Sequence, residues 1–599
     1  MVRSKRQGKR IVHERILYLG NLENIAVDQH RLLVERIGQL LAHQYYAKSE
    51  DEEIEKLAIG FVGKIFSRQS GHSYQGEVVK VSGGQITQGG IERIDMKEFM
   101  PVRLREGGSE WLCLQAIEEL GLRDYLLSCA GWTTSQVELV VMNLMGRLLY
   151  PTSERKTAMW LKDQTVTVEM MSQPQSIHGP GLSAAAVALH EEKEGLEDYL
   201  YEQLNELLDF GSSDYLYDLT NTYFEGRMQG SSLAQYGRSK EKRGDCPLVS
   251  IGLLTNELGF IRRSHFYSGN VSEPGTLEDV MPFLEQNAGI LTDAGIASRE
   301  NIEKLALQQI PYMCVVREGF AQFKVDFDEA TCYEHQATNG QKYKVWLTVR
   351  SHEFKVEDKT FTDTLIFVKS EAKQAKEDAM VTKQKHRVEK GLEQIKSSLS
   401  KSRGRKKVAQ IQQRIGKLKA ANSRVSKAFS IQTQDDGERV THLDWTYDAS
   451  HELRNGTYII RTSKEIQDAH QAWTTYHTLT KIEAINRCCK TDLNMRPVYH
   501  QKDHTIQAHL FLTLIACTIV TYIRHRLAKK GIHWSWKEIV RIMNTQKVVI
   551  TQFANDQNEL FLLNQWSRPE PKTDKIYQAM EYEKVPYKGF FFKIAKPDP

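Results

Sequence analysis

Three carboxylates occupy positions where an acidic side chain needs a partner. Asp218 lies in Tyr-Leu-Tyr-Asp-Leu-Thr-Asn-Thr-Tyr-Phe, among residue types that favour a β-strand while aspartate does not. Asp293 ends an apolar run before Ala-Gly, where open α/β sheets place ligand-binding residues. Glu483 lies in a predicted helix. Two or three carboxylates supply the oxygen ligands that Mg²⁺ needs, and two such ions clamp both oxygens of an in-line phosphoryl displacement.

Each carboxylate alone has a simpler interpretation. Asp218 also fits a hydrogen-bonded aspartate near a sheet edge, and Asp293 also fits an ordinary turn former. The helix face around Glu483 also fits an exposed surface with ion pairs at three- and four-residue spacing. The hypothesis of a shared site therefore depends on what surrounds the carboxylates.

Cationic and phenolic groups accompany Glu483 on its helix, which we expect to span residues 463–490. At 100° per residue, four side chains lie within roughly 40° of one line: Tyr476, Glu483, Arg487 and Lys490. The next segment, Arg496-Pro-Val-Tyr-His500, adds groups suited to phosphate. A basic loop after the first predicted strand is either a phosphate contact or a solvated loop, and its cations are Arg238, Lys240, Lys242 and Arg243.

The charge of the chain is unevenly distributed. The net charge is only +4, but residues 383–427 hold 15 Lys and Arg against two acids, a local charge of +13, so the remainder carries 4 − 13 = −9. Apolar residues of this segment recur at three- and four-residue steps, which predicts a helical hairpin: Val388, Leu392, Ile395 and Leu399. Such a hairpin is a solvated element, a DNA-binding surface, or both.

Composition places the chain among large globular proteins. Its 599 residues suggest about four domains, and 26% charged with 40% hydrophobic residues argue against wholesale disorder. The longest apolar run, residues 510–523, is short of the ~20 residues that a membrane helix needs, so we expect a buried core helix. No secretory signal is visible, and eight cysteines without a CxxC pair suggest neither a zinc site nor a disulfide framework.

The elements around the carboxylates predict an α/β layer architecture. Residues 108–208 have a helical pattern, and the period then changes to strands at 215–224, 247–254 and 260–267. A helix at 277–286, an apolar strand ending at Leu291, a helix from Ser298 and a strand at 312–316 follow. Residues 318–455 interrupt this series with β-rich segments and the basic hairpin, and a strand at 456–461 resumes it.

These residues carry a family resemblance. Asp218, Asp293 and Glu483, in their strand, strand-end and helix contexts, resemble the DDE triad of bacterial insertion-sequence transposases with an RNase H-like catalytic domain. A subgroup has the signature Y-x2-R-x3-E-x6-K, and Tyr476-x6-Glu483-x6-Lys490 is similar to it. Leu479 stands at the arginine position of the signature. Arg487 instead matches an E-x3-R-x2-K run of the closest branch.

The likeness extends over most of the chain. The carboxylate spacing, 293 − 218 = 75 and 483 − 293 = 190, is also similar to the subgroup, which fills the second gap with an inserted, mostly β domain. Further similar runs are residues 13–20, 217–224, 237–245, Gly269-Asn270, 293–295 and 496–500.

The resemblance implies a cut-and-paste transposase with a fold of defined parts. These are an α/β RNase H-like core, a β-rich insertion with a basic helical hairpin, and a mainly helical amino-terminal DNA-binding region. The corresponding segments are 1–105 (binding of DNA ends), 106–208 (helical), 209–317 (first part of the core), 318–455 (insertion, hairpin 383–427), 456–545 (second part of the core) and 546–599 (carboxy-terminal region).

The resemblance also implies the chemistry and the partners. Asp218, Asp293 and Glu483 would hold Mg²⁺ or Mn²⁺, as two ions, for hydrolysis of terminal phosphodiesters and strand transfer to target DNA. The partners are double-stranded DNA and a second copy of the chain in a synaptic dimer, with no membrane, in the bacterial cytoplasm at the nucleoid. DNA contacts are expected from Tyr476, Arg487, Lys490, Arg238, Lys240, Arg243, Arg496 and His500.

Two other functions remain open from the sequence. One is a catalytically inactive, transposon-derived DNA-binding protein, which the presence of all three carboxylates disfavours. The other is a metal-dependent nuclease that does not transfer strands.

Overall fold

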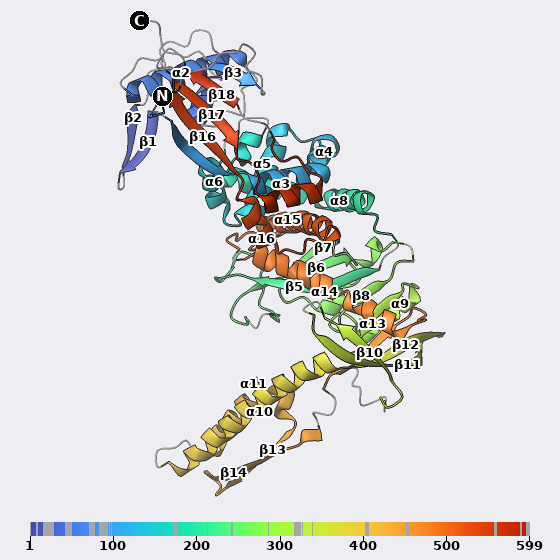
Figure 1. The fold of residues 1–599 in the computed structure, drawn as a ribbon. Helices are drawn as coiled ribbons and strands as arrows, with labels where there is room; N and C mark the ends of the chain where they lie inside the picture. Colours follow the sequence, from blue (N-terminus) through green and yellow to red (C-terminus); the bar gives the residue numbers. More distant parts are fainter. Residues whose placement is uncertain are drawn as a thin grey trace. The chain divides into compact units, whose positions relative to one another are not determined.

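The computed structural model divides into two compact units that are interleaved along the chain. The first unit comprises Met1–Gly211, Leu219–Val271 and Lys481–Pro599, and the second comprises Ser212–Asp218 and Ser272–Thr480. The architecture is mixed α/β (Figure 1). The structure describes residues 2–7, 10–15, 29–41, 51–70, 78–82, 94, 96–97, 99–171, 177–211, 214–240, 243–285, 287–316, 325, 327–337, 340–401, 407–450, 455–496, 498–555, 560–586 and 590–594.

A helical layer forms the core of the first unit. The helical pattern expected over 108–208 is confirmed by six helices, namely α3 (Gly108–Glu119), α4 (Leu122–Asp124), α5 (Thr134–Leu149), α6 (Glu154–Asp163), α7 (Gly179–Glu191) and α8 (Lys193–Leu208). Three of them, α3, α5 and α7, contact α15 (Asp503–Lys529). Helix α15 is long and apolar enough to cross a membrane, but 89% of its most apolar window is buried inside the protein. The expectation of a buried core helix is therefore confirmed.

An antiparallel sheet also belongs to the first unit, with strand order β3-β18-β17-β16-β4. Its strands are β3 (Val78–Ser82), β4 (Met100–Glu106), β16 (Lys547–Ala554), β17 (Leu560–Trp566) and β18 (Phe590–Ile594). Helix α17 (Pro571–Met580) lies between β17 and β18 in the sequence, and α16 (Trp536–Met543) precedes β16. The amino-terminal part forms a hairpin, β1 (Val2–Gln7) with β2 (Arg10–Arg15), and two helices, α1 (Gln29–Leu41) and α2 (Glu52–Ser70). Many of the remaining residues of the predicted region 1–105 lie outside the described residues.

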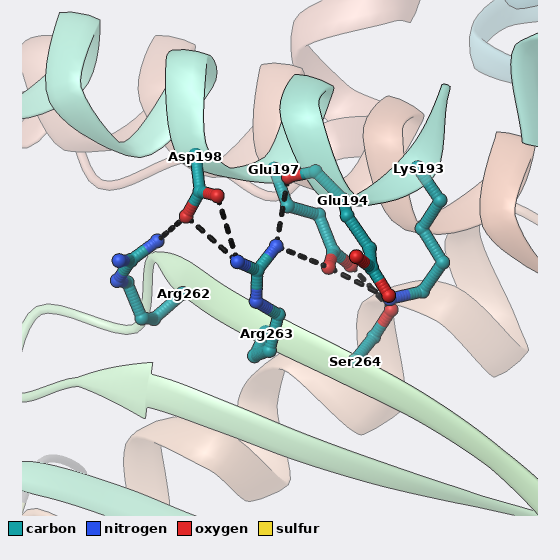
Figure 2. Close-up of polar contacts among 7 residues, drawn as sticks. All are labelled: Lys193, Glu194, Glu197, Asp198, Arg262, Arg263 and Ser264. Atoms are coloured by element: carbon teal, nitrogen blue, oxygen red, sulfur yellow. Dashed lines mark hydrogen bonds and ion pairs between the residues drawn. The ribbon is translucent and has the colours of Figure 1, made fainter. Parts of the chain in front are cut away.

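A β-hairpin of the first unit is held to α8 by ionic contacts. Strands β6 (Leu248–Asn256) and β7 (Ile261–Ser268) pair through the expected turn at 256–259, where Gly259 has a φ of 91°. Figure 2 shows Arg263 of β7 with both Nη atoms directed at α8, where Nη2 lies 2.8 Å from each carboxylate oxygen of Asp198. The buried Glu197 accepts from Lys193 at 2.8 Å and from the Ser264 hydroxyl. These contacts fix segments more than 60 residues apart.

The second unit contains a mixed sheet. Its strand order is β10-β11-β12-β15-β9-β8-β5, antiparallel from β10 to β9 and parallel from β9 through β8 to β5. The strands are β5 (Tyr215–Tyr223), which continues into the first unit after Asp218, β8 (Ile290–Thr292), β9 (Tyr312–Val315), β10 (Thr331–Gln336), β11 (Lys342–Val356), β12 (Lys359–Ser370) and β15 (Thr457–Thr462). Helix α9 (Arg299–Leu307) connects β8 and β9 and is capped by Ser298, as expected.

The helix predicted at 277–286 is absent from the described part of that segment. One short 3₁₀ turn, Glu273–Thr276, precedes this segment, and a second, Met281–Phe283, lies within it. Pro282 lies inside the second turn, and because proline has no N–H and clashes with the preceding helical turn, a regular helix does not extend through it.

The basic hairpin forms as expected and has a small core of its own. Its helices are α10 (Glu371–Ser400) and α11 (Val408–Ala421), and the strands β13 (Phe429–Asp435) and β14 (Val440–Tyr447) cover their apolar face. Residues 402–406, which hold three of the basic side chains, lie outside the described residues. Three residues of the predicted apolar stripe, Val388, Leu392 and Ile395, are buried in one core with Ile411, Ile415, Phe429 and Leu443. The fourth, Leu399, is partly buried and packs against this core.

The prediction of a single helix over residues 463–490 is wrong. The segment forms α13 (Ala469–His477), α14 (Thr480–Arg487) and a π-helical turn at Cys488–Asp492. Threonine hydroxyls satisfy backbone carbonyls at the break, since Thr478 Oγ1 donates to Thr475 O at 2.7 Å and Thr480 Oγ1 donates to His477 O at 2.8 Å. The constant 100° per residue, which placed Tyr476 and Lys490 on one face of a continuous helix, therefore does not apply to this segment.

Candidate active site

Two of the predicted carboxylates lie at matching positions of neighbouring parallel strands. In the pairing of β5 with β8, Tyr217 stands opposite Thr292. Asp218 is the next residue of β5, and Asp293 directly follows the end of β8, so each aspartate lies one residue beyond this pair. Neighbouring strands are about 4.8 Å apart, which brings the two carboxylates together. Both side chains are partly buried.

Backbone contacts orient Asp293. Its Oδ1 accepts from Gly295 N at 2.8 Å and from Ile296 N at 3.2 Å. A Cβ at position 295 would collide with the carboxylates of Asp293 and Glu273, so a larger residue there would displace these side chains. One oxygen of Asp293 is thus held by the turn that follows β8.

Glu273 is a third carboxylate to consider beside Asp218 and Asp293, because it lies close to Gly295. Its sequence context gives no sign of a functional role. Its turn is anchored to β5, because Thr276 Oγ1 donates to Glu273 O at 2.8 Å and Tyr217 Oη donates to Thr276 Oγ1 at 2.9 Å. In sequence, an acid before Pro-Gly is an ordinary turn residue. Only the fold brings it beside Gly295 and Asp293.

Tyr476 of α13 belongs to the same unit and is electrostatically coupled to both aspartates. Burial is the largest cause of a raised pKa of its phenol, and the charges of Asp293 and Asp218 raise the pKa further. The phenol therefore keeps its proton at neutral pH and remains a hydrogen-bond donor. The second unit thus brings together three of the predicted site residues: Asp218, Asp293 and Tyr476.

The other predicted site residues belong to the first unit. Glu483 and Arg487 are exposed on α14, one helical turn apart, and Lys490 is partly buried in the π-helical turn. Exposure leaves both α14 side chains accessible to a ligand. Their expected roles stay predictions.

The predicted basic loop of the first unit is anchored beside the second half of β5. Lys240 Nζ donates to Leu219 O, and Asn221 Nδ2 donates to Arg238 O at 3.1 Å. The guanidinium carbons of Arg243 and Arg496 lie 4.6 and 4.9 Å from the ring centroid of Tyr223. Two predicted phosphate ligands that are distant in sequence therefore share one aromatic ring, while Lys242 lies outside the described residues.

His500 takes part in a polar network of the first unit. His500 Nε2 lies 3.0 Å from Glu154 Oε1, and the buried His509 has Nδ1 3.1 Å from Arg147 Nη2 and Nε2 3.1 Å from Met495 O. Glu154, His500 and His509 are metal-ligand types within 4.8 Å of one another. However, the Arg147 guanidinium donates to the His509 nitrogen that a metal ion would need, which favours a structural network. The predicted contact of His500 with DNA stays a prediction.

We expect this network to make the first unit less stable in acid. Burial, and then the charge of Arg147, lower the pKa of His509 to about 4. The unfolded chain, with a histidine pKa of about 6.5, binds the proton first as the pH falls, so stability is lost between about pH 6.5 and 4 and is flat above. By pH 5 the loss from His509 is about 2 kcal/mol.

Denaturant unfolding at pH 7 and pH 5 measures this loss. The variant His509→Gln lacks the titrating group, and its stability should change less between the two pH values than that of the wild type. An equal change in both proteins would show that His509 is not the group responsible.

Comparison with known proteins gives a distant structural likeness. No protein-family model matches the sequence, and no curated protein matches it. Among solved structures, the chain is similar to a piggyBac transposase in a synaptic complex with hairpin DNA, determined by cryo-electron microscopy. The alignment covers 76% of this chain and 82% of that chain at 9% identity, with a TM-score of 0.34. We therefore infer the function from the residues of the site.

Proposed function

We propose that this chain is a DDE transposase with an RNase H-like core, which cleaves the ends of its own insertion sequence and joins them to target DNA. The observation that carries the proposal is the placement of Asp218 and Asp293, each one residue beyond the last pair of the parallel strands β5 and β8. The sequence resemblance around these residues and Glu483 supplies the reaction class.

The donor set suits a hard divalent cation. Carboxylate oxygens are the ligands that Mg²⁺ and Mn²⁺ prefer, and the turn after β8 already fixes one oxygen of Asp293. In the proposal Asp218, Asp293 and Glu483 hold two such ions. When bound, the ions neutralise the charge that develops on the phosphate and activate water.

The protein's own groups position the DNA. The protonated phenol of Tyr476 can donate to a phosphate oxygen, which an ionised phenol beside two aspartates could not do. The cations expected to contact phosphate are Arg238, Lys240, Arg243, Arg487, Lys490 and Arg496, with His500 as a further donor. In-line displacement then depends on positioning and charge neutralisation, without a covalent enzyme intermediate.

The proposal includes partners and location. Double-stranded DNA, as transposon ends and as target, is the substrate, and the exposed cations of α10 and α11 offer it a contact surface. Pairing of two ends implies a homodimer in the synaptic complex. The bacterial cytoplasm, at the nucleoid, is where such a substrate occurs.

Cleavage and joining of DNA that flanks the reading frame test the proposal. The full chain is incubated with this duplex and a plasmid target, with Mg²⁺ or with EDTA. We expect Mg²⁺-dependent release of 3′ hydroxyl ends and their insertion into the plasmid. Cleavage without joining of pre-cleaved ends would identify a nuclease, and binding without cleavage would identify a DNA-binding protein.

A further inference from the structure

A pocket of about 440 Å³ lies in the second unit, at the start of α9. Besides the α9 residues, its wall comes from the end of β11 and from β15, and none of the residues assigned above to the active site lines it. The polar and aromatic lining consists of Ser298, Arg299, Glu303, His352, Phe354, Lys355 and Arg461. Its volume is in the range of small-molecule sites.

Arg461 is the strongest indication that the pocket takes a ligand. This side chain of β15 is only 9% exposed, and its Nε donates to Asp363 Oδ2, which also accepts from the Tyr312 hydroxyl. Its guanidinium carbon stacks 4.3 Å from the ring centroid of Phe354. These contacts hold the guanidinium in one orientation on the pocket wall.

One donor of Arg461 is left over. Its buried Nη2 has no hydrogen-bond partner among the residues that the structure describes. A buried donor without a partner costs about 1–3 kcal/mol, and more when it is charged. That nitrogen is enclosed by protein atoms, so a ligand in the pocket meets the remaining exposed surface of the Arg461 side chain.

The start of α9 adds a second feature that favours an anion. The helix has nine residues, and its Ser298 cap takes only the N–H of Asn301 at 3.2 Å. The positive end of a helix dipole stabilises negative charge. Glu303, the acidic residue of the lining, is paired with Arg299 at 2.8 Å.

We propose that this pocket binds the phosphate group of a nucleotide-sized ligand, with the side chains of Arg461 and Lys355 as its cationic contacts. A phosphate oxygen accepts from a guanidinium in the geometry that this side chain offers. The volume leaves room for a sugar beside the phosphate. The ligand is either a free nucleotide or a nucleotide within a DNA strand, and the proposal does not depend on the activity proposed above.

Calorimetric titration of the full chain tests the proposal with three probes at one ionic strength. The probes are inorganic phosphate, dAMP and a 5′-phosphorylated single-stranded hexanucleotide. We expect dAMP to bind, and Arg461→Lys to weaken its binding about tenfold or more, because lysine keeps the positive charge but loses the planar, forked donors of the guanidinium. Lys355→Gln, at an exposed position that tolerates substitution, should weaken binding severalfold.

Matched variants and probes decide the outcome. Lys342→Gln, at the opposite end of the same strand β11, should bind dAMP as the wild type does. Tighter binding of the hexanucleotide would assign the pocket to a DNA strand, and equal or weaker binding would assign it to a free nucleotide. Absence of dAMP binding to the wild type at about 10 mM, or wild-type binding by both Arg461→Lys and Lys355→Gln, would overturn the proposal. No arm uses DNA cleavage, so failure here and failure of the proposed activity are distinguishable.

Discussion

Asp218→Asn and Asp293→Asn are each expected to lower Mg²⁺-dependent DNA cleavage by a factor of about 10³ or more. Each substitution removes a charged metal ligand but almost no volume. A metal ion supplies several kcal/mol of transition-state stabilisation, and each 1.36 kcal/mol is a factor of ten in rate. Binding of the DNA ends should change less than about threefold, because it depends on the cations. Single-turnover cleavage and a binding titration measure the two effects separately.

Asp358→Asn provides the matched control, because it makes the same chemical change at an exposed turn of the same unit. It should cleave at the wild-type rate. Glu483→Gln should behave like the two aspartate variants. Wild-type cleavage by Glu483→Gln alone would remove Glu483 from the ligand set, whereas wild-type cleavage by either aspartate variant would refute the site itself.

Removing charge from the helical hairpin is expected to flatten the salt dependence of DNA binding. The proposed variant replaces four exposed cations of α10 and α11 with glutamine and leaves the buried apolar stripe intact: Lys383, Arg387, Lys390 and Lys417. Each phosphate that is no longer neutralised by a cation lowers the slope of log K against log[salt] by about 0.9. If all four cations bind phosphate in the wild type, DNA binding by the variant near 0.1 M salt should be weaker by a factor of about 10² to 10³.

Binding titrations at several salt concentrations measure that slope. The control replaces four exposed lysines of the first unit: Lys529, Lys530, Lys537 and Lys572. It has the same net charge as the hairpin variant, so equal slopes in the two variants would mean that overall charge, and not the hairpin, governs binding. An unchanged slope in the hairpin variant would make the hairpin a structural element.

Local patterns predicted the elements whose signals are strong. The alternation in residues 247–267, with glycine at the turn, predicted the β6–β7 hairpin, and Ser298 marked the start of α9. The three- and four-residue spacing of Val388, Leu392 and Ile395 predicted the buried stripe of α10. In each case the residues that determine the element are adjacent in sequence.

Other features escaped prediction because they depend on competition or on distant contacts. The hydroxyls of Thr478 and Thr480 donate hydrogen bonds to nearby backbone carbonyls where the helix is interrupted. A hydropathy pattern does not reveal this competition with the helix. The grouping of Asp218 with Asp293 was implied by the resemblance to the DDE triad. The turn that contains Glu273 is held to β5 only through contacts of Thr276 with Glu273 and Tyr217, which the sequence pattern does not show. Arg461 in the pocket and Glu154 in the histidine network depend on contacts with residues far away along the chain.

The interleaving of the two units has a consequence for biosynthesis. Ribosomes deliver the chain from its amino terminus, so Ser272–Thr480 is complete before Lys481–Pro599 has been made. Until then, α3, α5 and α7 lack α15, the apolar helix against which they pack. Synthesis of the second unit is therefore completed before that of the first unit, although synthesis of the first unit starts earlier. During translation the helical layer exposes apolar surface that a chaperone would recognise, and a messenger truncated after residue 480 would yield a first unit without its core.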